Sequence, residues 1–175
     1  MSRDLNLLTT EFKMDIEEVL ISCKLKGIDI VPFYTIRSPE SQAKLYRQSR
    51  SWREISNTIE MLSVNNAKYL SYILYSVGPQ YGKGEVTKAY PGLSWHQFGE
   101  AVDCFVLYDE KAIWDDNHPY YAKYALIAKS IGLEAGFYWD SFKDACHIQK
   151  RKGSPLDYYS LKEIDKLIEE KFKNE

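Results

Sequence analysis

The chain alternates short segments that favour β-strands with longer segments of helical periodicity. Its β-favouring or extended segments predict strands near residues 28–36, 101–107, 134–139 and 146–149. Apolar residues at helical spacing predict helices at about 10–26, 39–46, 52–62, 67–77, 119–131 and 160–168. Pro32 cannot donate a ladder hydrogen bond, which favours an edge position for the first strand. We therefore expect an α+β fold, with a small antiparallel sheet flanked by helices.

Size and composition indicate one domain. The 175 residues are 45% hydrophobic and 14% aromatic, which is enough to build one compact core. Neither an internal repeat nor a low-complexity linker is evident. We therefore expect residues 1–175 to form a single catalytic domain.

Charge and targeting signals exclude several classes of protein. Lysine and arginine number 23 against 25 acidic residues, so the net charge of -2 disfavours nucleic acid and anionic lipid as partners. The N-terminus is charged where a signal peptide is apolar, and no run approaches a membrane span. Three cysteines give no disulfide framework. We expect a monomer made in a reducing cytoplasm without a signal peptide.

Two of the three histidines lie in segments that resemble metal sites. Six residues separate His96 from Asp103, and His147 follows Asp144 by three positions. Two imidazoles and one carboxylate suit a catalytic zinc, which keeps a fourth position for water. One Zn²⁺ held by His96, Asp103 and His147 would activate water for hydrolysis. The spacing alone is a weak signal, because a single histidine is more often structural.

Three blocks in order carry a family resemblance. Ser94-Trp-His-Gln-Phe-Gly-Glu-Ala-Val-Asp103 resembles a signature of the zinc D-Ala-D-Ala carboxypeptidases and L-alanyl-D-glutamate endopeptidases, peptidase family M15. Residues 139–149 and the Arg-Ser-x-Glu-x-Gln block that begins at Arg37 resemble two further blocks of this family. The resemblance covers most of residues 28–149. It implies a fold like that of the DD-peptidases and Hedgehog domains.

The resemblance also implies roles for individual residues. It gives zinc binding to the triad named above, general acid/base catalysis to Asp144, and stabilisation of a substrate oxygen to Arg37. Asp144 could instead only orient His147. Arg37 could be a residue at the strand-to-helix corner that pairs with a surface carboxylate. Further candidates for substrate contact or for support of the site are Ser94, Gln42 and Trp139. His118 is expected to be a solvated loop residue.

The cysteines next to two proposed ligands offer an alternative metal set. Cys104 follows Asp103 and Cys146 precedes His147, and thiolates bind zinc well. Neighbouring side chains on a strand point to opposite faces, so we expect both thiols to point away from the metal, into the core, and near each other. A cysteine peptidase is disfavoured because only His118 is left as a base.

The resemblance implies hydrolysis of peptidoglycan stem peptides. It favours the L-Ala–D-Glu bond, as in phage endolysins; the alternatives are a D-alanyl-D-alanine carboxypeptidase and a non-catalytic zinc module for wall binding or signalling. An endolysin would act on the cell wall after release through a phage holin. Residues 51–81 depart from the family pattern, and we expect them to be a helical insertion that shapes access to the cleft.

Overall fold

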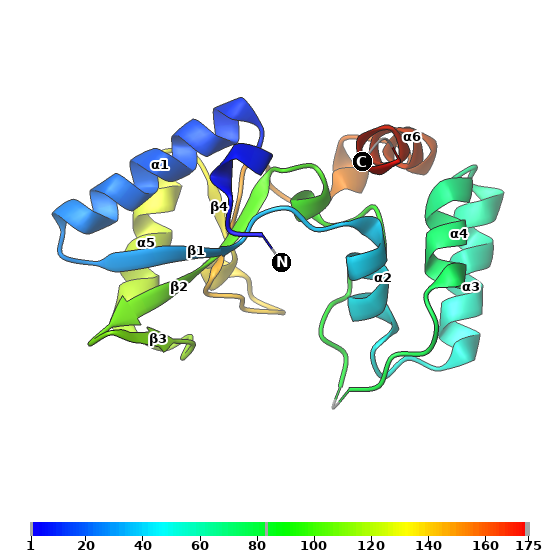
Figure 1. Ribbon diagram of the computed structural model, residues 1–175, viewed down its shortest axis with the longest axis horizontal. Helices are drawn as coiled ribbons and strands as arrows, with labels where there is room; N and C mark the ends of the chain where they lie inside the picture. The colour runs from blue at the N-terminus through cyan, green and yellow to red at the C-terminus, as the bar shows by residue number, and fades with distance from the viewer. Residues whose placement is uncertain (1, 83, 174–175) are drawn as a thin grey trace. The chain divides into compact units, whose positions relative to one another are not determined.

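The computed structural model describes residues 2–82 and 84–173 (Figure 1). This part of the chain divides into two compact units. The first unit comprises Met1–Ile36 and Phe98–Lys152, and the second comprises Arg37–Gln97 and Gly153–Glu175. The single catalytic domain expected from the sequence stays a prediction. Within the described ranges, no helix has the length and apolar character needed to cross a membrane.

The first unit contains the sheet and two long helices. Its elements are a 3₁₀ turn η1 (Leu5–Leu7), α1 (Thr10–Leu25), β1 (Asp29–Tyr34), β2 (Ala101–Tyr108), β3 (Lys111–Ile113), α5 (Pro119–Ser130), β4 (Glu134–Ala135), the 3₁₀ turn η3 (Gly136–Tyr138) and β5 (His147–Gln149). The strands are antiparallel in the order β1-β2-β5-β4, and β3 also pairs with β2. The predicted α+β class, the antiparallel sheet and the edge position of β1 are confirmed.

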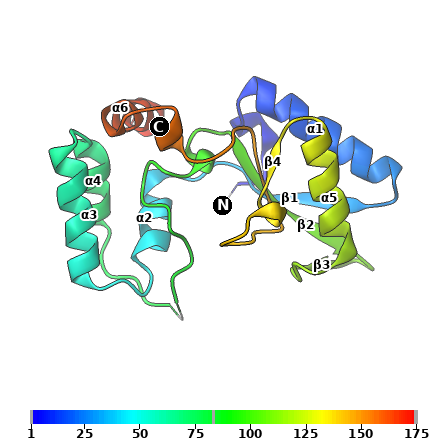
Figure 2. The same cartoon turned by 180° about the vertical axis from the view of Figure 1, so that it is seen from behind.

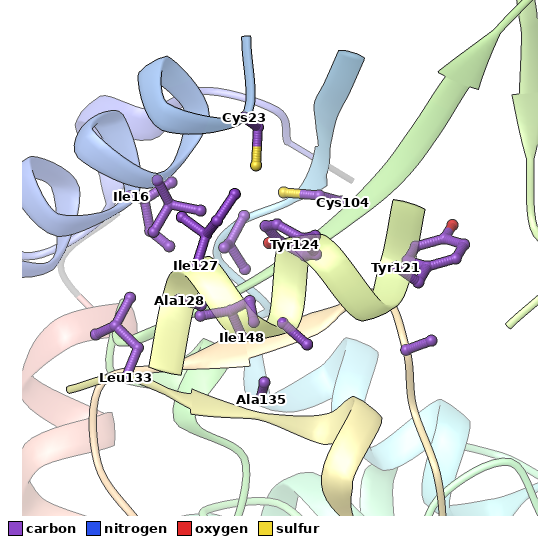
Figure 3. Packing of buried hydrophobic residues seen from close by; sticks show 14 of the residues in the cluster. Ile16, Cys23, Cys104, Tyr121, Tyr124, Ile127, Ala128, Leu133, Ala135 and Ile148 are labelled. Atoms are coloured by element: carbon purple, nitrogen blue, oxygen red, sulfur yellow. The ribbon is translucent and has the colours of Figure 1, made fainter. Parts of the chain in front are cut away.

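One face of this sheet packs on the helices. Val102, Cys104 and Val106 alternate along β2 and belong to the buried core with residues of α1 and α5, and Ile148 of β5 joins them (Figure 3). Side chains alternate across a strand, so Asp103 points to the opposite face of the sheet. The same alternation along β5 places His147 on that opposite face. The hydrophobic pattern thus fixes which face carries the polar candidates.

The second unit is helical. It contains α2 (Pro39–Arg47), α3 (Trp52–Val64), α4 (Lys68–Ser76), the 3₁₀ turns η2 (Trp95–Gln97) and η4 (Pro155–Asp157), and α6 (Leu161–Phe172). The helices α3 and α4 lie side by side in both views (Figures 1 and 2). They are the helical pair predicted for residues 51–81, with the break at Asn65 and Asn66, and φ is positive at Asn66. Its role in access to a cleft stays a prediction.

Two local predictions need correction. The extended segment expected at 134–139 is extended only at its first two residues, because the chain then turns: the amides of Trp139 and Asp144 both donate to the carbonyl of Gly136. The strand β3 was not predicted. It follows a tight turn at Asp109 and Glu110, both with positive φ, and that pair lacks the Asn-Gly or Asp-Gly signal of such hairpins.

Asp165 holds the second unit together at the start of α4. This buried carboxylate of α6 accepts hydrogen bonds from the amides of Leu70, at 2.8 Å, and Tyr69, at 3.3 Å. Ala67, at the helix N-cap, offers no capping side chain. Asp165→Ala is expected to lower the free energy of unfolding by about 1–3 kcal/mol, because buried amides lose their acceptor. Urea unfolding measures this free energy, and Lys162→Ala, at an exposed position of the same helix, is the matched control. Equal losses of stability in the two variants would contradict the role of Asp165.

Candidate active site

Asp103 and His147 lie opposite each other on neighbouring strands. They are register partners in the β2–β5 ladder, and Nδ1 of His147 lies 2.9 Å from Oδ1 of Asp103. His147 is buried and Asp103 is half-buried. Burial alone would lower the pKa of His147, but the hydrogen bond and charge of Asp103 outweigh it and raise that pKa. The pair is therefore a site that favours a positive charge.

The hydrogen bonds around His147 determine which of its nitrogens faces that charge. The amide nitrogen of Gln149 donates to the carbonyl of Arg151 at 2.6 Å, which directs Oε1 of Gln149 toward His147. Nε2 of His147 lies 3.0 Å from this oxygen and must donate to it. In the neutral imidazole, Nδ1 then presents a lone pair to a carboxylate oxygen. Two acceptors face each other here, an arrangement that a bound cation stabilises.

The third proposed ligand is His96, in the turn η2. His96 is 1% exposed, and one ligand atom each of His96, Asp103 and His147 lies within 4.8 Å of the others. The donor set of two imidazoles and one carboxylate is that of an open catalytic zinc site. The Gln149 oxygen on the far nitrogen of His147 is the kind of partner that orients a metal-binding imidazole. The residues present therefore fit a zinc ion, and zinc binding by His96, Asp103 and His147 stays a prediction.

Asp144 lies beside this group on the turn that leads into β5. Ligand atoms of Asp103, Asp144 and Cys146 lie within 4.8 Å of one another. The amide of Asp144 donates to the carbonyl of Gly136 at 3.0 Å, and its own carbonyl accepts from the amide of His147 at 3.2 Å. The backbone thus fixes Asp144 next to a proposed ligand, where a proton-transferring carboxylate is needed.

Gly136 leaves the space that this turn occupies. A Cβ atom at position 136 would lie 2.5 Å from the carbonyl oxygen of Asp144 and 3.2 Å from Cβ of His147. Because the first of these neighbours is backbone, it could give way only if the turn moved. This glycine is therefore part of the site, although its sequence context predicts no such role.

Gly136→Ala is accordingly expected to displace the turn that carries Asp144. We expect a loss of about 1–3 kcal/mol in the free energy of unfolding, the usual cost of overfilling a packed site. Zinc affinity should fall as well, since His147 adjoins the same atoms. Denaturant unfolding and zinc titration measure both effects. Gly78→Ala is the matched control because a Cβ at position 78 would meet nothing within 4 Å beyond its chain neighbours. Unchanged stability and zinc affinity in Gly136→Ala would refute the close contact between position 136 and the turn at Asp144.

Arg37 makes hydrogen bonds within the second unit. Its Nη1 donates to Oε1 of Gln42 at 3.0 Å, and its amide donates to the carbonyl of His96 at 3.3 Å. Gln42 is buried and donates in turn to the carbonyl of Ala89 at 2.7 Å. Gln42 is thus a positioning residue for the guanidinium. The backbone contact places Arg37 beside the segment that carries His96.

Trp139 packs on a proposed ligand. Its ring centroid lies 5.1 Å from that of His147, and its Nε1 donates to Glu134 at 3.1 Å. This contact limits the orientations of the imidazole. Ser94 lies in the turn before η2, where its carbonyl accepts from the amide of Gln97 at 2.9 Å. His118, expected in a solvated loop, instead caps α5 by accepting from the amide of Tyr120 and is half-buried.

The prediction for the cysteines holds for one thiol only. Cys104 is fully buried in the core, as expected. Cys146 does not point wholly away from the site: its Sγ donates to Oδ1 of Asp144 at 3.0 Å and belongs to a group with Asp103. The strand rule did not apply because β5 begins at His147, so Cys146 still lies in the turn. All three cysteines are free thiols.

These thiols are expected to be unreactive in the folded protein. Burial raises the pKa of Cys23 to about 11 and that of Cys104 to about 12, and it also raises the pKa of Cys146. The thiolate is the reactive form. At pH 8, iodoacetamide should therefore label the native protein far more slowly than the urea-unfolded protein, which mass spectrometry can count. Rapid labelling of Cys104 in the native protein would show that this thiol is not buried.

Sequence reasoning missed two residues of the site. Gln149 lies in the block of residues 139–149 that resembles the family, but the sequence predicts no role for Gln149 or for Gly136. The His-x-Gln spacing of His147 and Gln149 could have indicated the first, because alternate residues of a strand share a face. No local signal distinguishes Gly136 from a turn glycine.

A family model described as D-alanyl-D-alanine carboxypeptidase, of peptidase family M15, matches residues 87–150. This segment holds the proposed ligands and Asp144. No curated protein matches the chain. Among solved structures, the L-Ala D-Glu endopeptidase ChiX of Serratia marcescens is similar, with 16% identity, a TM-score of 0.47, and coverage of 83% of this chain and 81% of that chain.

Proposed function

We propose that this chain is a zinc peptidase of family M15 that hydrolyses peptidoglycan stem peptides at the L-Ala–D-Glu bond. The observation that carries the proposal is the buried Asp103–His147 pair with His96 within 4.8 Å, inside the segment that matches the family. A zinc ion bound there would supply a nucleophilic water near neutral pH and polarise the carbonyl under attack. The proposed place of action is the cell wall, where this substrate lies.

The chain's own residues have separate roles in this proposal. Asp144 accepts the proton of the attacking water and returns it to the leaving amine, as a general base and then a general acid. Arg37, held by Gln42, donates to the substrate oxygen on which negative charge develops. Trp139 and Gln149 fix the imidazole of His147 from two sides.

The choice of bond rests on the sequence blocks. The Arg-Ser-x-Glu-x-Gln block at Arg37 and the aspartate at position 144 resemble the endopeptidases of the family. The matching family model is described as a D-alanyl-D-alanine carboxypeptidase, which makes removal of the terminal D-Ala the second candidate. Both reactions are amide hydrolyses and need the same catalytic groups.

Digestion of purified peptidoglycan distinguishes these candidates. Zinc-loaded protein is incubated with the wall, and mass spectrometry identifies the released ends. New N-terminal D-Glu is the expected result, and free D-Ala would replace the endopeptidase with a carboxypeptidase. An intact wall with bound protein would favour a non-catalytic zinc module and overturn the enzymatic proposal.

A further inference from the structure

A cavity in the second unit has no part in the site described above. It has a volume of about 360 Å³, near the lower end of the roughly 300–1,000 Å³ of small-molecule sites. Among the residues that the structure describes, its lining includes two arginines, Arg47 and Arg50, two aromatic residues, Trp52 and Tyr81, and no acidic residue. All of these lie between the end of α2 and the loop after α4. The lining is therefore basic and aromatic.

Arg47 contributes a buried positive charge to this cavity. Its side chain is buried, and Nη1 donates to the carbonyls of Leu74, at 3.2 Å, and Tyr75, at 3.4 Å, in the last turn of α4. Across the described residues, no carboxylate forms an ion pair with Arg47. Burial lowers its pKa, the direction expected for a cation that has lost water. A guanidinium has five N–H donors, and these carbonyls occupy one nitrogen.

Arg50 differs because its charge is already matched. Its Nη2 lies 3.0 Å from Oε2 of Glu85 and donates to the carbonyl of Thr87 at 2.7 Å. Its guanidinium also lies over the ring of Tyr46, 4.0 Å from the centroid. The positive charge left for a ligand in this cavity is therefore that of Arg47.

The aromatic residues give the cavity an apolar wall. Trp52 is 57% exposed and Tyr81 is 93% exposed, although both are large and apolar enough to be buried. The guanidinium of Arg47 lies 5.5 Å from the centroid of the Trp52 ring, so charge and ring are adjacent. An exposed aromatic ring beside a buried cation suits a ligand with one carboxylate and one flat apolar face.

We propose that this cavity binds a carboxylate-bearing glycopeptide, with the carboxylate on Arg47 and a sugar ring against Trp52 and Tyr81. The choice of a wall fragment as this ligand rests on the proposed function. The cavity would then hold a part of the same polymer whose peptide bond is cut. Recognition of the carboxylate is a property of Arg47 and does not depend on catalysis.

Binding is tested with the full chain carrying Asp144→Asn, which prevents turnover. The probe is N-acetylmuramyl-L-alanyl-D-isoglutamine, which has one carboxylate and one sugar ring. Isothermal titration compares it with its neutral amide, with N-acetylglucosamine and with inorganic phosphate. We expect the acid to bind at least about tenfold more tightly than the amide, as loss of a charged hydrogen bond implies. Equal affinity of acid and amide, or equally tight binding of phosphate, would overturn the proposal.

Variants separate this cavity from the active site. Arg47→Gln should weaken binding of the acid by about tenfold or more, and Arg47→Lys should restore part of it. Trp52→Ala and Tyr81→Ala change exposed side chains, so they keep the test valid if Arg47→Gln fails to fold. Tyr72→Ala, exposed on α4 and outside the lining, is the control. Unchanged affinity for the probe in the Trp52 and Tyr81 variants would refute the cavity site, even if the wild type cuts peptidoglycan. If the probe bound at the cavity but the wild type did not cut peptidoglycan, only the proposed function would be refuted.

Discussion

Asp144→Asn is expected to lower the hydrolysis of peptidoglycan by about 100- to 10,000-fold while zinc remains bound. Asparagine keeps the size of the side chain and the backbone bonds that hold the turn against Gly136. It removes the group that takes and returns the proton. The rate of release of new wall ends measures the first effect, and metal analysis of the same sample measures the second.

The matched control for Asp144→Asn is Asp140→Asn, which changes an exposed aspartate four residues earlier. The control should keep the wild-type rate. If Asp144→Asn kept its activity, Asp144 would only orient His147, the structural alternative. If it lost zinc as well as activity, Asp144 would belong to the metal site and its role in proton transfer would be unsupported.

His96→Ala is expected to lower the affinity for zinc by at least about 100-fold, and activity should fall with it. The estimate is a lower bound, since loss of a residue that only supports a ligand already costs about 10- to 100-fold. Asp103→Ala should have a similar effect and should also remove the partner of His147 Nδ1. Competition with a zinc-binding dye measures the affinity of each variant.

The third histidine provides the control for the ligand variants. His118→Ala removes a helix cap from α5 and no proposed ligand. It should keep one tightly bound zinc, with at most a loss of about 0.5–2 kcal/mol in stability. If His118→Ala lost zinc while His96→Ala kept it, the proposed ligand set would be wrong.

Local signals were enough to predict most of the elements. The helix α2 begins where Ser38 and Pro39 indicate, with the Ser38 hydroxyl accepting from the amide of Ser41. The closing helix begins at the predicted capping box of Ser160 and Glu163. Such signals lie within one turn of the chain, so a sequence contains them completely. The alternation along β2 similarly predicted that Cys104 and Asp103 would point to opposite faces.

Features that depend on distant contacts were not predictable in this way. Whether Gly136 is needed depends on the turn at Asp144, which packs against it only in the folded chain. The orientation of Cys146 depends on the residue at which β5 begins, and strand ends are poorly marked in sequence. The uncompensated charge of Arg47 likewise becomes visible only when its neighbours, two carbonyls and an aromatic ring, are known.

Zinc titration of the metal-free enzyme tests most directly whether the ligand triad is a catalytic metal site. Protein freed of metal by chelation is mixed with increasing zinc, and the release of peptidoglycan ends is followed at each ratio. Activity should be absent without metal, rise in proportion to zinc, and level off at about one ion per chain, as one site of three protein ligands requires. Full activity in the chelated protein, or zinc binding that leaves the wall intact, would contradict a zinc peptidase.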